Sequence, residues 1–153
     1  MGIEVREPQT EEEFEEYYRL RYERLRAPHG QSPGSERNDP NEPISKHVIA
    51  KMDGRIVGAE CWVVLEKGSQ SNRQLYARSR QTAVDPDYEG AGVASAMLNY
   101  VFDRARELGC NEIVANVRNE IVGFAESLGF KVTAPGTKLF ETVEHVFMVK
   151  PLR

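Results

Sequence analysis

The stretch from residue 81 to residue 98, QTAVDPDYEGAGVASAML, constrains the fold of this chain more than any other. It predicts a strand that ends at Val84, a break at Asp85-Pro86, and a helix that begins after Gly92. Glycine at positions 90 and 92 lets the backbone approach a ligand closely, and the first N–H groups of a helix point outward without partners. Because these donors and the positive end of the helix dipole favour an anion, the turn is predicted to hold a phosphate or diphosphate.

This strand-turn-helix resembles the acetyl-CoA-binding motif of the GNAT superfamily of N-acetyltransferases, Gln/Arg-x-x-Gly-x-Gly/Ala. Gly92 and Ala94 occupy the last two places of that motif, and Ser95 follows where the family often has a hydroxyl that contacts phosphate. Glu89 departs from the pattern, because the family has Gln or Arg there and a carboxylate repels a diphosphate. The cofactor-binding residues that the resemblance implies are Ala83, Val84, Glu89, Gly90, Ala91, Gly92, Val93, Ala94, Ser95, Arg118 and Phe124.

A Gly-x-Gly between a strand and a helix also fits a dinucleotide-binding turn. That alternative expects an acidic residue at the end of the next strand, about 20 residues further on. The next predicted strand, 112–117, has its acid at the start, and Val117 is followed by Arg118. The turn also lies mid-chain, so too little sequence follows for a two-halved nucleotide domain. These points favour the GNAT resemblance.

The predicted elements follow the GNAT order along the whole chain. Strands are predicted at residues 2–7, 47–52, 55–65, 75–84, 112–117, 130–133 and 145–150, and helices at 11–26, 93–108 and 121–128. Residues 67–74, KGSQSNRQ, are predicted to form a polar loop. The fold class is therefore α/β, with a mixed, mostly antiparallel sheet of about seven strands. The resemblance implies a central parallel pair splayed at the CoA site, flanking helices, and one domain over residues 1–153.

Residues 27–46 are rich in Pro, Gly, Ser and Asn and are predicted to be irregular. In the GNAT fold a segment at this place helps to wall the acceptor site. The helix before it carries four arginines, which we interpret as a solvated face that could also meet an acidic substrate or the CoA phosphates. These are Arg19, Arg21, Arg24 and Arg26.

The resemblance also implies a general acid that this chain lacks. In the family a tyrosine near the CoA sulfur protonates the leaving thiolate. The stretch RNEIVGFAESLGFKV, aligned on Gly129 and Phe130, places Ala125 at that position. Phe124 then takes the preceding aromatic position, and Arg118 takes the place of an Asn that often opens the motif.

Acetyl transfer to an amine needs a deprotonated amine and a polarised thioester carbonyl. The backbone N–H groups near Ala83 and Val84 could polarise the carbonyl. His145 and Glu60 are the candidate catalytic bases, acting directly or through water, and His47 is a further candidate. Each also has an ordinary structural interpretation, as a solvent-facing glutamate or as a histidine that only begins a strand.

Composition limits the partners and the location. A net charge of −4 and a pI near 5.5 give no reason to expect nucleic acid or an anionic membrane as a partner. The N-terminus holds no apolar segment of the secretory type, and Cys61 and Cys110 lie in apolar surroundings without metal-binding spacing. We therefore expect a cytoplasmic protein with buried thiols and no metal site.

The resemblance implies an acetyl-CoA-dependent N-acetyltransferase that acts on a primary amine of a small molecule or peptide. It leaves a homodimer open. The alternative from another class is a CoA-binding module without catalysis, with a sensing or interaction role, and Glu89 and Ala125 both favour it.

Overall fold

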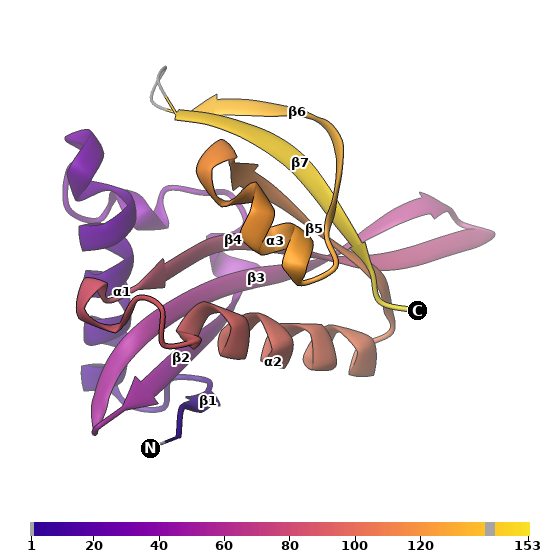
Figure 1. Ribbon diagram of the computed structural model, residues 1–153. Coiled ribbons are helices and arrows are strands. Elements are labelled where there is room, and N and C mark those ends of the chain that lie inside the picture. Colours follow the sequence, from indigo (N-terminus) through magenta and orange to yellow (C-terminus); the bar gives the residue numbers. More distant parts are fainter. Residues whose placement is uncertain (1, 140–142) are drawn as a thin grey trace. The chain divides into compact units, whose positions relative to one another are not determined.

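The computed structural model describes residues 2–139 and 143–153 (Figure 1). Over these residues the strands are β1 (Glu4–Arg6), β2 (Lys46–Met52), β3 (Arg55–Ser69), β4 (Asn72–Val84), β5 (Cys110–Arg118), β6 (Lys131–Leu139) and β7 (Val143–Pro151). The α-helices are α1 (Glu11–Leu25), α2 (Val93–Glu107) and α3 (Val122–Ser127). The strands pair in the order β1-β2-β3-β4-β5-β7-β6, and β4 and β5 are parallel. The predicted fold class, α/β with a mixed, mostly antiparallel sheet, is confirmed, and β4 and β5 are its parallel pair.

The chain divides into two compact units, residues 1–63 with 81–101 and residues 64–80 with 102–153. In the first unit, α1 packs on one face of the strands through Tyr17 and Leu20, which contact a core that includes Ile49 and Ala59. Neighbouring residues of a strand point to opposite faces. Gly58, next to Ala59, accordingly faces the first turns of α2, where an added Cβ would lie 2.6 Å from Val93 Cγ1. The strands of this unit therefore lie between α1 and the start of α2 (Figure 1).

In the second unit, β5, β7 and β6 form an antiparallel sheet, and the first half of β4 pairs with β5 (Figure 1). The β4–β5 register runs from Leu75 opposite Cys110 to Ser79 opposite Ala115. The C-terminal part of α2 packs here through Phe102, whose ring centroid lies 5.8 Å from that of Phe130. None of the described helices has the length and apolar character needed to cross a bilayer.

The prediction of a polar loop at residues 67–74 is wrong. Strand β3 continues to Ser69 and β4 begins at Asn72, so only a tight turn separates them. Charged side chains sustain the strands beyond their apolar part: Arg73 pairs with Glu66 at 2.8 Å, and Lys67 pairs with Glu112 at 2.9 Å. Arg73 and Glu66 lie on the neighbouring strands β4 and β3, and such a pair stabilises a sheet without apolar burial. Strand β6 is likewise longer than the predicted 130–133.

Residues 27–46 contain three 3₁₀ turns, Ala27–His29, Ser35–Arg37 and Glu42–Ile44, and no α-helix. Arg21 of α1 attaches this segment. Its Nη2 donates to the Glu36 carbonyl at 2.7 Å and to Glu42 at 3.0 Å, and its Nη1 donates to Glu42 at 3.2 Å. Arg21 is 0% exposed, so its assignment to a solvated face is wrong. It follows Tyr17 by four positions, and helical spacing therefore places both side chains on the buried face.

Candidate functional site

The turn before α2 has the conformation that its glycines suggested. Gly90 and Gly92 have φ angles of 80° and 84°, in the left-handed region that favours glycine. An added Cβ at either position would meet nothing within 4 Å, so the space in front of the turn is open. The Asp85 side chain accepts a hydrogen bond from the Asp87 N–H at 2.9 Å and stabilises the 3₁₀ turn Pro86–Tyr88.

In the described part of the chain, several N–H groups at the start of α2 have no backbone acceptor. The first intrahelical bond runs from the Ala96 N–H to the Gly92 carbonyl at 3.0 Å. Among the described residues, no backbone acceptor takes the N–H groups of Gly92, Val93, Ala94 or Ser95. Unpaired donors at a helix N-terminus, reached over an exposed glycine turn, fit a diphosphate. The residues of this turn therefore fit the phosphate end of CoA.

Glu89, the departure from the family motif, is bound by an arginine. Nη2 of Arg24, in α1, donates to its carboxylate at 2.8 Å. Both side chains are partly exposed, 35% for Arg24 and 60% for Glu89. The negative charge that the sequence places at the turn is therefore paired with a cation from a distant part of the chain.

Glu60 lies in the interior of the first unit, not at the solvent. It is 0% exposed, and its carboxylate accepts a hydrogen bond from the Thr82 hydroxyl. On the Glu60 backbone, the carbonyl lies 3.3 Å from the Tyr17 hydroxyl, which is also 2.7 Å from Nδ1 of His47. Burial raises the pKa of Tyr17, so this hydroxyl stays protonated. Glu60, Thr82, Tyr17 and His47 thus form a connected polar group beside β4.

His145 belongs to the second unit, in β7, where it pairs in register with Arg118 of β5. It is 9% exposed, and its Nδ1 lies 3.0 Å from the Val143 carbonyl oxygen. Because a carbonyl only accepts, Nδ1 carries the proton, and Nε2 is the acceptor nitrogen of the neutral ring. That is the tautomer of a histidine that can take a proton through Nε2.

Phe124 and Ala125 lie in α3, also in the second unit. Phe124 is 37% exposed, whereas Ala125 is 7% exposed and its carbonyl accepts the N–H groups of Leu128 and Phe130. The position where the family has tyrosine is therefore packed against other atoms in this chain.

The predicted site residues fall into two groups. The first unit brings together the turn residues 89–95, Ala83, Val84 and Glu60, and the second unit contains Arg118, Phe124 and His145. Sequence reasoning missed Arg24 as the partner of Glu89, and it missed the bond between Thr82 and Glu60. No local pattern signals either contact, because 65 residues separate Arg24 from Glu89 and 22 separate Thr82 from Glu60.

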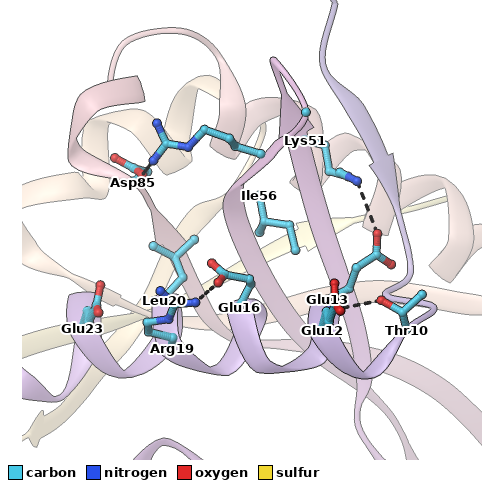
Figure 2. Close-up of a pocket in the computed structure, with 12 residues that line it drawn as sticks. Thr10, Glu12, Glu13, Glu16, Arg19, Leu20, Glu23, Lys51, Ile56 and Asp85 are labelled. Carbon is cyan, nitrogen blue, oxygen red and sulfur yellow. Dashed lines mark hydrogen bonds and ion pairs between the residues drawn. The ribbon is translucent and has the colours of Figure 1, made fainter.

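A cavity of about 540 Å³ lies along α1 in the first unit, and the turn residues 89–95 are not among the residues that line it (Figure 2). Charged side chains line it, and many of them pair with one another. Lys51 lies 3.4 Å from Glu13 and Arg55 lies 3.6 Å from Asp85, while Arg19 pairs with Glu16. Because each basic side chain that lines the cavity is paired with a carboxylate, we do not assign the cavity to the anionic cofactor.

Comparison with known proteins identifies the family of this chain. A sequence profile of the acetyltransferase (GNAT) family matches residues 6–130. The chain is 30% identical over 88 residues to a glucosamine 6-phosphate N-acetyltransferase of Trypanosoma brucei brucei, a match that covers 58% of this chain and 59% of that protein. The chain thus spans less than two thirds of the length of this relative.

Solved structures share the fold. The structure of the NatC complex bound to Gag peptide and CoA matches with a TM-score of 0.78 at 18% identity, and 100% of each chain is covered. A structure described as histone acetyltransferase HPA2 and related acetyltransferase, from Corynebacterium glutamicum ATCC 13032, matches with a TM-score of 0.75 at 19% identity, covering 99% of this chain and 97% of that one. At these identities the likeness concerns the fold alone.

Proposed function

Because the chain belongs to the acetyltransferase (GNAT) family, whose members use acetyl-CoA, we propose that it is an acetyl-CoA-dependent N-acetyltransferase. The acceptor that we propose is a primary amine of a small molecule or peptide. The observation that carries the proposal is the open glycine turn at the head of α2, with N–H groups that lack acceptors. Acetyl-CoA, when bound, supplies the acetyl thioester that the amine attacks.

The residues proposed to hold the cofactor have different roles, in binding the diphosphate, in polarising the thioester carbonyl and in further contacts. The N–H groups of Gly92, Val93, Ala94 and Ser95 bind the diphosphate through the helix N-terminus. Backbone N–H groups near Ala83 and Val84 polarise the thioester carbonyl. Arg118 and Phe124 are further cofactor contacts that the family resemblance implies.

We propose His145 as the general base, with Glu60 as the second candidate. The hydrogen bond from Nδ1 to Val143 orients the His145 ring and leaves Nε2 able to accept a proton, directly or through water. The Glu60 carboxylate is already engaged by Thr82, which favours a supporting role for it. Comparing the kcat of His145→Gln and Glu60→Gln at saturating acetyl-CoA tests the order: His145→Gln should lower kcat more, and a larger loss in Glu60→Gln would reverse the assignment.

Departure of the thiolate is proposed to proceed without a side-chain acid, because Ala125 replaces the family tyrosine. A thiol has an ordinary pKa of about 8.5, so unassisted departure is chemically tolerable. A positioned acid would typically add about 10²–10⁴-fold to the rate. Slow transfer is therefore expected.

The extent and location of the protein are also proposals. The family profile covers residues of both compact units, which supports the proposal that residues 1–153 act as one domain. Cys61 and Cys110 are buried thiols outside any disulfide, which is compatible with a reducing cytoplasm. Homodimer formation stays a prediction.

The first experiment is a calorimetric titration with acetyl-CoA, using Gly92→Asp as the test variant. The aspartate would add a side chain at a left-handed φ and a negative charge in the anion site, so binding should be lost. Gly30→Asp is the matched control, since Gly30 also has a positive φ, of 71°, and open space around it. Equal binding by wild type and Gly92→Asp would contradict the cofactor site.

The second experiment is a thiol-release screen over primary amines, polyamines, peptides and amino-sugar phosphates. The amino-sugar phosphates are included because of the relative that acetylates glucosamine 6-phosphate. We expect measurable transfer to at least one amine. Tight CoA binding with no turnover of any amine would favour the alternative function, a CoA-binding module without catalysis, which the absence of the family tyrosine at Ala125 supports.

A further inference from the structure

The turn proposed to hold the diphosphate is acidic. Between β4 and α2 it carries Asp85, Asp87 and Glu89 and no Lys or Arg. Two of these carboxylates are met by arginines from other elements: Arg55 of β3 lies 3.6 Å from Asp85, and Arg24 of α1 lies 2.8 Å from Glu89. The positive charge at this turn is therefore supplied from outside it.

The two arginines differ in what they can do for a ligand. Asp85 has a structural role, since its side chain already accepts the Asp87 N–H, and Arg55 lies beyond hydrogen-bond distance from it. Arg24 makes a short, charge-assisted bond to Glu89, the residue directly before Gly90. A guanidinium has five N–H donors. The contact with Glu89 uses one nitrogen, and within the described chain the remaining donors of Arg24 have no partner.

We propose that Arg24 is a cofactor-binding residue, whose guanidinium is oriented by Glu89 and binds the diphosphate of CoA beside the N–H groups of Gly92 to Ser95. In this arrangement the cation is carried by α1, and the acidic residue in the turn holds it there. A carboxylate that would repel the ligand by itself becomes the residue that positions an arginine. This inference rests on the proposed function, because it concerns the same cofactor site.

A simpler role for Arg24 would be to neutralise Glu89 without contacting the ligand. The two roles give different results once Glu89 is made neutral. If Arg24 only neutralises the carboxylate, its removal from a Glu89→Gln protein has no effect. If it contacts the diphosphate, its removal weakens CoA binding in both backgrounds.

The test is a calorimetric titration of four proteins with CoA: wild type, Arg24→Gln, Glu89→Gln and the double variant. We expect Arg24→Gln to raise the Kd about tenfold in the wild-type background, the magnitude of one partly exposed, charge-assisted hydrogen bond. A smaller but measurable loss is expected in the Glu89→Gln background, because Arg24 is still present there but is no longer oriented by the carboxylate. Dephospho-CoA, which keeps the diphosphate and lacks the 3′-phosphate, should show the same ratio.

Arg19→Gln is the matched control, because Arg19 lies on the same helix and pairs with the nearby Glu16. It should leave the Kd unchanged, and circular dichroism checks that all variants fold. Equal affinity of Glu89→Gln and the double variant would overturn the inference, as would a loss that disappears with dephospho-CoA. If wild type itself binds no CoA, the proposed function fails instead, so the two failures are distinguishable.

Discussion

Replacing Glu42 by alanine is expected to destabilise the protein strongly, although Glu42 lies in an irregular segment. The reason is its partner Arg21, a fully buried cation whose donors all have acceptors. Nε donates to Gln81 at 2.8 Å, Nη1 to the Tyr17 hydroxyl at 3.3 Å and to Glu42 at 3.2 Å, and Nη2 to Glu42 at 3.0 Å and to the Glu36 carbonyl at 2.7 Å. These contacts match the five N–H groups of a guanidinium.

The size of the expected loss of stability follows from the Arg21 charge that Glu42→Ala leaves buried without its partner. Burial is the largest influence on the pKa of Arg21 and lowers it, but hydrogen bonding to Glu42 and neighbouring groups raise the pKa above its ordinary value, so the group is charged. Glu42→Ala removes two charge-assisted bonds and leaves a buried cation without its counter-ion, which costs about 3–5 kcal/mol. We expect about 3 kcal/mol, the low end of that range, because the Glu42 side chain is 12% exposed and water can replace part of it.

The assay is urea denaturation of wild type, Glu42→Ala, Arg21→Met and the double variant. Coupling between the sites predicts that the double variant loses less stability than the sum of the single variants, by about 1 kcal/mol or more. Glu23→Ala, an exposed position on α1, is the control and should stay within about 0.5 kcal/mol of wild type. A loss below about 1 kcal/mol for Glu42→Ala would refute the reasoning, because it would mean that Arg21 does not depend on this carboxylate.

Three further predictions concern other parts of the chain. Gly58→Ala should destabilise the protein by about 1–3 kcal/mol in urea, because its Cβ would lie 2.6 Å from Val93 Cγ1; an unchanged midpoint would contradict this. Ala125→Tyr should lower Tm without raising the transfer rate, since only 7% of Ala125 is exposed; a faster enzyme with unchanged Tm would show that the position opens. The hydrogen bond from Arg6 holds the pKa of Glu13 well below its usual range, so Glu13 stabilises the fold above the ordinary glutamate pKa of about 4.3 and less as the pH falls. Glu13→Gln should therefore be less stable than wild type at neutral pH in urea, with a difference that shrinks near about pH 3; a difference independent of pH would be evidence against it.

The order of the elements could be predicted because each one depends on local signals. Thr10 accepts the Glu13 N–H at 3.1 Å at the start of α1, and α2 begins directly after Gly92, as predicted. The hairpin at 70–71 was missed because its strands are sustained by charge pairs such as that of Arg73 with Glu66, and not by apolar alternation.

The site was predictable only where it depends on backbone conformation. The positive φ angles of Gly90 and Gly92 follow from residue type, and the unpaired N–H groups follow from helix geometry. The partners of Glu89 and Glu60 were not predictable, because Arg24 and Thr82 reach them through tertiary packing. The burial of Arg21 could have been inferred, since it shares the helical stripe of Tyr17, but its charge suggested a solvated face.

The attachment of residues 27–46 to α1 also determines how the acceptor range of such a protein could be altered by directed evolution. One of the two groups that this segment offers to Arg21 is the main-chain carbonyl of Glu36, which any residue provides, and the other is the carboxylate of Glu42. Gly34 has a φ of 91° and should be kept. Positions 32, 33, 38 and 40 are exposed, and they provide neither a group that binds Arg21 nor the positive φ of Gly34. A library randomised at those four positions would therefore vary the chemistry of the segment that the family resemblance places at the acceptor site, while the backbone keeps its path.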